Sequence, residues 1–386
     1  MAQRKKTTSK RLEKNVNKAV TELSKTKGGR VFLVIIVMLL IAALAFGAYW
    51  FYFRKLGQDA ETQGFPDVSD QDISIHFLEL GNSYAGDCIY IKTAESDILI
   101  DCGSRLNSLS TITDYLGHYA EDGVFEYVIL THAHQDHIAG FAAAQYQNSF
   151  FGKYTINVFI DSATNATTQL YSYYTANLAQ AVSNGTQHYT ALQCVNETDG
   201  ARRSYNIGSG YTMTILDSYY YANPAAYSDE NNNSVCCLFS NGTKNYLFTG
   251  DLEEEGEEKL IQRNTLPKVD LFKAGHHGSY TASTSALMSV IRPKVVVVCC
   301  CAGSSEYTDN NDNKFPSQNF VNNVSPYTTE VYVTTLYDAS AEGKHVSFNG
   351  NIVYMAKGEV YKVVCSASSV KLKDSEWFKQ NRTWGS

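Results

Sequence analysis

Hydrophobic residues from position 73 onward are grouped in short runs that turn residues separate. Apolar, β-branched runs of this kind predict buried strands, at 73–80, 88–92, 98–101, 125–130 and 155–161, and again at 235–239, 246–251, 269–273, 294–301 and within 330–364. Longer amphipathic stretches predict helices at 106–119, 138–145, 170–183 and 283–291, and one that starts at Glu253. Each half of this region starts with meandering strands and then alternates strands with helices. This order predicts an α/β fold of two packed sheets with helices outside.

Two stretches have weaker patterns. Residues 162–233 are rich in Tyr, Asn, Thr and Ser, so we expect long loops there around the helix at 170–183. Residues 366–386 carry Trp377 and Trp384 in a polar setting, and this tail either packs back on the domain or frays.

A long uncharged run precedes the patterned region. Residues 31–53 contain no charged side chain and can cross a hydrocarbon core of about 30 Å as a helix. Ten Lys and Arg against two Glu in residues 1–30 predict that the amino end stays in the cytoplasm. A cleaved signal peptide is the alternative, but its apolar core is usually shorter and a small-residue cleavage site follows it.

We therefore expect an uncleaved signal anchor and a single-pass protein of the cell membrane with an extracytoplasmic carboxyl-terminal domain. The predicted segments are a basic cytoplasmic segment at 1–30, the transmembrane anchor at 31–53, a linker at 54–72, a hydrolase domain at 73–365 and a tail at 366–386.

The charge balance changes once the chain is divided at this anchor. Of 32 basic and 39 acidic residues, ten and two lie in residues 1–30, so the remaining 22 and 37 give the rest of the chain a formal charge of −15. Such a field repels polyanions and disfavours DNA or RNA as a partner. A substrate that carries one phosphate stays compatible, because bound metal ions can reverse the potential inside a site.

The nine cysteines do not suggest a metal cage, because their number is odd and no CxxC pair occurs. Most of them lie inside apolar runs, for example Cys236 and Cys237, which favours small buried thiols. One or two disulfides, for example one that includes Cys194, stay open as an alternative.

The most informative motif is Thr-His-Ala-His-Gln-Asp-His-Ile-Ala-Gly at 131–140, directly after the predicted strand 125–130. It places four ligand-type residues within six positions, namely His132, His134, Asp136 and His137. Imidazole nitrogen and carboxylate oxygen are the ligands of Zn²⁺ in sites that keep an open position for water. They also suit Mn²⁺ or Fe²⁺, so ligand type alone does not identify the metal.

This motif resembles the signature of the metallo-β-lactamase superfamily, whose fold is an αβ/βα four-layer sandwich with metal bound at one edge. Two further elements follow the order of that superfamily: Ile98-Leu-Ile-Asp101-Cys-Gly103 and Phe248-Thr-Gly-Asp251. The resemblance implies that Asp101 orients a ligand histidine from the second coordination shell and that Asp251 bridges two metal ions. Without the resemblance, Asp251 is equally well read as the N-cap of the helix that follows.

Within the superfamily the chain is similar to the hydrolase domain of ComEC-type DNA-uptake proteins and to cell-surface phosphorylcholine esterases. The similarity is carried by the segments 75–81, Gly86-Asp87, Asn232-Asn-Ser234 and Gly275-His-His-Gly-Ser279. A later Gly-His-Pro segment commonly supplies another histidine in that branch, but this chain has Phe315 there. His188 is the only other histidine between the cluster and Asp251, and its role stays open.

These residues imply metal-dependent hydrolysis with one or two divalent ions, zinc in the first place and manganese as the alternative. His132, His134, Asp136, His137 and Asp251 are the expected ligands. Asp136 is also the expected proton acceptor, and His276 and His277 are expected to stabilise an oxyanion or to act as general acid.

The expected substrate is a small or cell-wall-linked phosphodiester or a related ester, and DNA is disfavoured by the charge. The alternative is a degenerate, non-catalytic binding module at the cell surface, which the absence of a histidine at Phe315 motivates.

Overall fold

The computed structural model describes residues 65–164, 166–225 and 227–385, together with residues 21, 24–28, 31 and 35. The chain divides into two compact units, Met1–Thr62 and Gln63–Ser386, and the second contains every element discussed below. Among the described residues, no helix combines the length and the hydrophobicity that a membrane span requires. Apart from Val31 and Ile35, the predicted anchor at 31–53 lies outside the described residues.

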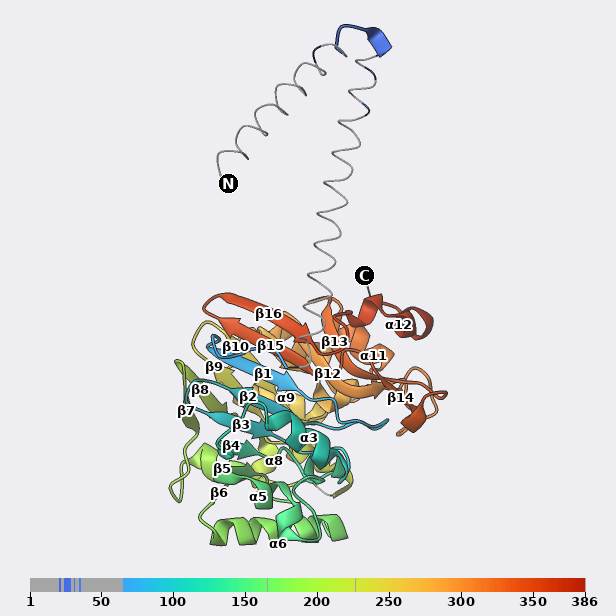
Figure 1. The fold of residues 1–386 in the computed structure, drawn as a ribbon. Coiled ribbons are helices and arrows are strands. Elements are labelled where there is room, and N and C mark those ends of the chain that lie inside the picture. The colour runs from blue at the N-terminus through green and yellow to red at the C-terminus, as the bar shows by residue number, and fades with distance from the viewer. Residues whose placement is uncertain are drawn as a thin grey trace, which may run out of the picture. The chain divides into compact units, whose positions relative to one another are not determined.

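The first sheet has eight strands in the order β16-β15-β1-β2-β3-β4-β5-β6 (Figure 1). It is antiparallel from β16 to β3 and parallel from β3 to β6. Its strands are β1 Ile73–Phe77, β2 Ile89–Lys92, β3 Asp97–Ile100, β4 Val124–Ile129, β5 Thr155–Asp161, β6 Gln187–Thr190, β15 Ile352–Lys357 and β16 Val360–Cys365.

The second sheet also has eight strands, in the order β14-β13-β12-β11-β10-β9-β8-β7. Its central strands β10 to β13 are parallel, and β7 to β10 are antiparallel. Its strands are β7 Ser204–Gly208, β8 Tyr211–Ile215, β9 Cys237–Ser240, β10 Asn245–Phe248, β11 Leu271–Lys273, β12 Val295–Ala302, β13 Glu330–Tyr337 and β14 His345–Ser347.

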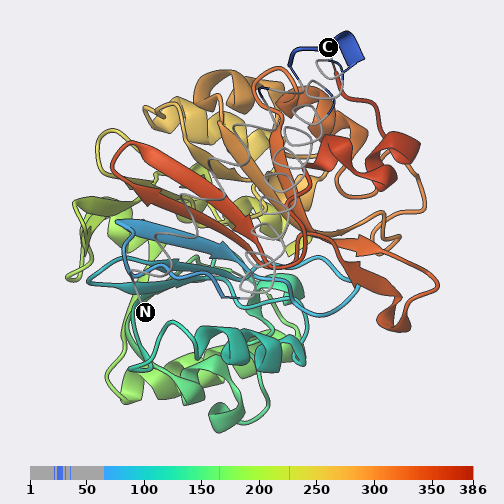
Figure 2. The same ribbon diagram turned by 45° about the horizontal axis from the view of Figure 1, so that its top comes forward.

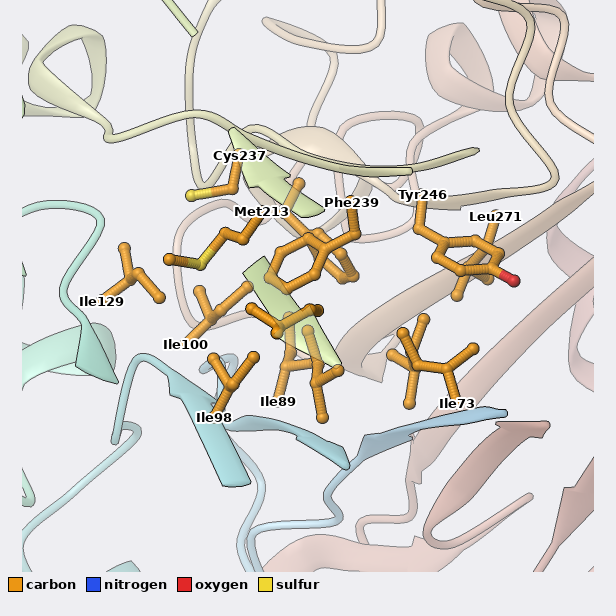
Figure 3. Close-up of a cluster of buried hydrophobic side chains, with 14 of the residues drawn as sticks. Ile73, Ile89, Ile98, Ile100, Ile129, Met213, Cys237, Phe239, Tyr246 and Leu271 are labelled. Carbon is orange, nitrogen blue, oxygen red and sulfur yellow. The ribbon is translucent and has the colours of Figure 1, made fainter. Parts of the chain in front are cut away.

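The two sheets pack face to face, and the alternation of residues along the strands explains why. In β3, Ile98 and Ile100 point into the space between the sheets, whereas Leu99 lies in the cluster on the outer face. Figure 3 shows these isoleucines, with Ile73, Ile89 and Ile129, facing side chains of the second sheet such as Met213 and Phe239. Both faces of each sheet are therefore buried, as parallel strands require.

Helices cover the outer faces, so four layers result (Figure 2). The outer cluster of the first sheet includes residues of α3 (Ser108–Leu116) and α6 (Gln169–Ser183), and that of the second includes residues of α9 (Glu254–Arg263), α10 (Ser285–Ile291) and α11 (Gln318–Val324). The shorter helices are α4 Gln135–Ile138, α5 Phe150–Lys153, α7 Ala191–Asn196, α8 Tyr219–Ala222 and α12 Glu376–Asn381. The predicted αβ/βα sandwich is confirmed for this unit.

The helix predicted at 138–145 is wrong, since α4 ends at Ile138. The chain turns there because Gly140 packs against Cys102, with its N–H 2.6 Å from the Cys102 carbonyl oxygen. A side chain at this glycine would lie 2.3 Å from the Cys102 sulfur. The helix therefore ends directly after the histidine cluster.

Residues 162–233 contain more regular structure than expected, because β6, β7 and β8 lie there in addition to α6. In β8, Tyr211, Met213 and Ile215 are buried in the central core, while Thr212 and Thr214 alternate with them. The tail packs back on the domain, since Trp377 and Trp384 lie against the outer cluster of the second sheet. All nine cysteines are buried and unpaired, so the disulfide alternative is not borne out.

Candidate metal centre

The candidate residues follow the carboxyl ends of central strands in both sheets. Asp101 follows β3, the histidine cluster follows β4, Asp251 follows β10, and His276 with His277 follows β11. Parallel strands end at one edge of a sheet, and ligands bind there in open α/β sheets. Face-to-face packing brings the two edges together, and the side chains converge.

Four buried residues form a compact group, which we call the four-residue group: Asp136, His137, Asp251 and His277. One ligand atom from each lies within 4.8 Å of the others. The Asp251 Oδ2 atom is 3.1 Å from His137 Nε2 and 3.0 Å from His277 Nε2. The Asp136 Oδ2 atom is 3.3 Å from His277 Nε2.

This donor set fits a divalent metal ion. His277 Nε2 is fully buried and has no hydrogen bond of acceptable geometry, although two carboxylate oxygens lie within 3.3 Å. A buried polar atom without a partner is costly unless something else binds it. Two imidazole nitrogens and two carboxylate oxygens that converge in this way suit zinc or manganese.

Asp101 fixes the orientation of His137. Its Oδ2 atom is 2.7 Å from His137 Nδ1 and accepts a hydrogen bond of 2.7 Å from the Thr131 hydroxyl, while its Oδ1 atom accepts one of 2.7 Å from the Thr131 backbone N–H. With Nδ1–H directed at Asp101, Nε2 faces the four-residue group, as in other carboxylate–histidine–metal arrangements. Gly103 permits this packing, because a Cβ there would lie 1.6 Å from the Asp136 carbonyl oxygen.

Replacing Asp101 with alanine is expected to weaken metal binding by about 10–100-fold, because His137 loses the partner that sets its ring orientation. Competitive titration of the purified protein with a metal-binding dye measures this change. Asp97→Ala is a matched control, since Asp97 lies on β3, the strand that Asp101 follows, but binds Lys92. Equal metal affinity in the Asp101 variant and the wild type would contradict the orienting role.

His132 and His134 form a pair beside the four-residue group. His132 Nε2 lies 3.2 Å from His134 Nδ1, and the His132 ring centroid lies 4.1 Å from that of His137. Burial lowers the pKa of His132 well below its ordinary value, with the charge of His137 as the next cause. A neutral imidazole with a lone pair toward the centre is the form that binds a metal.

Two residues without a predicted role, Asp87 and Lys273, complete the centre. The fully buried Lys273 ammonium group lies 2.5 Å from Asp87 Oδ2 and 3.2 Å from Asp251 Oδ1. Asp87 Oδ1 is 3.4 Å from His277 Nδ1. Lys273 therefore holds one oxygen of Asp251, which leaves Oδ2 as the atom that faces both His137 and His277.

Charge in this pocket shifts the histidine and carboxyl groups in opposite directions. Burial alone would lower the pKa of His137 and His277, but the Asp251 carboxylate and its neighbours outweigh it and raise the pKa of both well above the ordinary value. Burial would raise the pKa of Asp251, yet the charges of His277, His137 and Lys273 lower it well below the usual range. In the metal-free protein these shifts favour the protonated form of both imidazoles.

His276 and His277 lie in a tight turn with strained backbone. Both have left-handed φ angles, 44° and 52°, which non-glycine residues rarely adopt. Outside the turn, the buried Glu257 accepts hydrogen bonds from the Ser283 and Thr284 backbone N–H groups, and Ser283 Oγ accepts from Gly275. His277 is fully buried, whereas 17% of the His276 side chain is exposed, on the solvent-facing side of the centre that we call its mouth.

His276 has a different environment from His277. Its Nδ1 atom lies 3.0 Å from Thr281 Oγ1 and 3.2 Å from Glu253 Oε1, while Nε2 is 3.9 Å from Asp251 Oδ2. It lies at the edge of the four-residue group, not within it. The sequence predicts one shared role for His276 and His277, but only His277 belongs to the four-residue group.

Phe315 supplies no ligand, but it packs beside the centre. Its ring centroid lies 5.7 Å from that of His276 and 6.0 Å from that of His277. The four-residue group is complete without a residue at 315. His188 lies outside the centre, with its Nε2 atom 2.8 Å from Asp161 Oδ1 on β5.

Residues 78–323, almost two-thirds of the chain, match the family described as anti-Pycsar protein Apyc1. The chain belongs to the Apyc1 family. The matched region contains every residue of the candidate metal centre, from Asp87 to Phe315.

Shorter similarities link the chain to two curated proteins. Recombination protein 2 of Haemophilus influenzae is 39% identical over 66 residues, which are 17% of this chain and 8% of that protein. ComE operon protein 3 of Bacillus subtilis is 35% identical over 69 residues, which are 17% of this chain and 9% of that protein. The chain thus spans less than a tenth of the length of either relative.

Solved structures with a similar fold include two with TM-scores of 0.41. The metallo-β-lactamase fold protein YhfI from Bacillus subtilis is 14% identical, and the alignment covers 68% of this chain and 96% of that one. The long form of RNase Z from yeast is 10% identical, with coverage of 73% and 43%. These values are too low to transfer an activity. The sequence matches support the predicted resemblance to the ComEC-type branch of the metallo-β-lactamase superfamily.

Proposed function

We propose that this Apyc1-family chain is a metal-dependent hydrolase that cleaves a phosphodiester or a related ester. The observation that carries the proposal is the four-residue group, in which the buried His277 Nε2 has no hydrogen bond although it faces Asp136 and Asp251. The neighbouring pair His132 and His134 provides nitrogen atoms for a second ion. One or two divalent ions are proposed, with zinc ahead of manganese.

Bound divalent ions supply Lewis acidity, which lowers the pKa of water and offsets charge that develops on a phosphoryl group. Residues around the four-residue group orient the atoms that would hold such ions. Asp101 sets the His137 ring, and Lys273 keeps one oxygen of Asp251 turned away from the centre. His276 faces the mouth and is placed to stabilise an oxyanion or to protonate a leaving group.

The role of Asp136 shifts from proton acceptor toward ligand. Burial opposes its charge, but the close contact with His277 and the charges of His137 and His277 lower the pKa of Asp136 far below its usual range. A carboxylate held ionised in this way binds a cation well and accepts a proton poorly. We therefore propose Asp136 as a ligand first.

Partners and location are proposed from the sequence. Residues 31–53 anchor the chain in the cell membrane with the amino end in the cytoplasm, so the hydrolase domain acts outside. The substrate is a small or cell-wall-linked phosphodiester, and the charge of −15 after residue 30 disfavours DNA.

Turnover of bis-p-nitrophenyl phosphate with added Zn²⁺ or Mn²⁺ tests the activity. His134→Ala is expected to lower the rate by roughly 100-fold or more, beyond the loss that outer partners of metal ligands cause. His345→Ala is the matched control, because His345 lies on β14 and hydrogen-bonds its own loop at the Gly343 carbonyl. Turnover without added metal after chelation, or equal rates in the two variants, would contradict the proposal.

A non-catalytic binding module is the other candidate, and Phe315 is the residue that favours it. Metal analysis of the purified protein separates the two. Two ions per chain favour the hydrolase, and less than one tightly bound ion favours the binding module.

A further inference from the structure

Tyr307 is the one tyrosine whose hydroxyl reaches the four-residue group in the described part of the chain. The hydroxyl donates a hydrogen bond of 2.8 Å to Asp136 Oδ2. The ring centroid lies 5.3 Å from that of Phe315, which in turn packs beside His276 and His277. The residue is nevertheless 53% exposed, so it stands on the solvent-facing side of the centre.

The side chain next to Tyr307 in the sequence, that of Glu306, is anchored to loops that follow β1 and β3 of the first sheet. The carboxylate of Glu306 accepts a hydrogen bond of 2.7 Å from Arg105 and one of 2.8 Å from the Ala85 backbone N–H. The Arg105 guanidinium group lies 3.9 Å from the ring centroid of Tyr84. These contacts fix the loop on which Tyr307 stands, so its hydroxyl is held near the centre before any substrate binds. A donor held in advance needs no reorganisation during a reaction.

The hydrogen bond to Asp136 can be exchanged for one to a substrate. Asp136 Oδ2 is also 3.3 Å from His277 Nε2 and belongs to the ligand atoms of the group, so a bound cation satisfies it without the phenol. A phosphoryl oxygen held at the centre is an anionic acceptor of the same kind as a carboxylate oxygen. The Tyr307 hydroxyl can therefore exchange the Asp136 carboxylate for a phosphoryl oxygen and still donate one hydrogen bond in each state.

We propose that Tyr307 is a substrate-binding residue, whose hydroxyl donates a hydrogen bond to a phosphoryl oxygen at the centre. It reaches the centre from the loop that also carries Phe315, and so supplies a polar group on the side where this chain lacks a histidine. This inference rests on the proposed function, because it takes the ligand to be a phosphoryl group. No proton leaves the phenol, which acts as a donor only.

The test compares Tyr307→Phe with Tyr84→Phe, since each variant loses one hydroxyl from a half-exposed tyrosine on the same rim. Isothermal titration of the zinc-loaded full chain with inorganic phosphate is the first readout, and zinc content per chain is the second. In Tyr307→Phe, phosphate is expected to bind roughly tenfold more weakly with unchanged zinc content. Tyr84→Phe is expected to stay within about twofold of the wild type.

Turnover of bis-p-nitrophenyl phosphate provides a third readout, with kcat/KM expected to fall about tenfold or more in Tyr307→Phe. Unchanged phosphate affinity in this variant overturns the proposal. Loss of zinc from it also overturns the proposal, because Tyr307 would then be a positioning residue for Asp136. If the wild type binds phosphate but cleaves no phosphodiester, the proposed function fails, whereas the phosphate titration still decides the role of Tyr307.

Discussion

Replacing His277 with alanine is expected to remove one metal ion per chain and to lower phosphodiester turnover by more than about 100-fold. The reason is its position: His277 Nε2 lies 3.0 Å from Asp251 Oδ2 and 3.3 Å from Asp136 Oδ2 in a fully buried site. Even the outer partners of metal ligands cost 10–100-fold when they are lost, so a ligand should cost at least that much. Elemental analysis of the purified variant gives the ion count.

The adjacent histidine is the matched control. His276 Nε2 is 3.9 Å from Asp251 Oδ2, and Nδ1 is directed at Thr281 and Glu253. His276→Ala is therefore expected to keep the full metal content while turnover falls roughly 10–100-fold, the loss typical of one transition-state donor or acid. Both variants keep the same turn, and circular dichroism shows whether each is folded. Metal loss in the His276 variant with retention in the His277 variant would reverse the two assignments.

The sequence predicts the part of the centre that is local in the chain. His132, His134, Asp136 and His137 lie within six positions after one strand, so their convergence depends only on a turn. Asp251 could be predicted because it ends a strand in a Thr-Gly-Asp element that follows the cluster in the order of the superfamily. The cluster and Asp251 could thus be predicted from the spacing and the order of residues along the chain.

The remaining residues of the centre depend on how the two sheets pack. Asp87 precedes β2 of the first sheet, Lys273 ends β11 of the second, and the two meet in a buried ion pair. Asp87 belongs to a segment that carries the family resemblance, but nothing in the sequence pairs it with Lys273, because a single aspartate or lysine near a strand is common in any protein. The same holds for Tyr307, whose only sequence signal is its place on the loop before Phe315.

The fold was predictable where hydrophobic runs were continuous and less so where polar residues alternated with them. Strand β5 matches its prediction at both ends, since Thr155–Asp161 is bounded by clear turn residues. Strand β7 was missed because Tyr205 and Ile207 are separated by polar residues in a stretch rich in Asn and Ser. Tertiary packing, through burial of alternate side chains against the first sheet, decides that segment.

Metal binding is expected to release about two protons per chain near neutral pH. In the metal-free protein, the carboxylates around His137 and His277 raise the pKa of both imidazoles well above the ordinary value of 6.5, which favours the imidazolium form of both. A metal binds only the neutral imidazole, so each ligand must lose its proton first. His132 adds no proton, because burial lowers its pKa. The apparent affinity therefore rises with pH, by up to about 100-fold per unit if both protons leave together.

The same shifts determine how metal-free stability depends on pH. A pKa that folding raises contributes stability that is fully present below the unfolded value of 6.5 and is lost as pH rises through the folded value. Asp251 has a lowered pKa, so its contribution is present above 3.8 and is lost as pH falls. The metal-free protein should thus melt at progressively lower temperature as pH rises above 6.5, and the metal-bound protein should not, because the ion replaces the two protons.

The number of protons released on zinc binding can be measured by calorimetric zinc titrations at one pH in buffers with different ionisation enthalpies. His277→Ala should release about one fewer, and heats that do not depend on the buffer would show that the two histidines are already neutral.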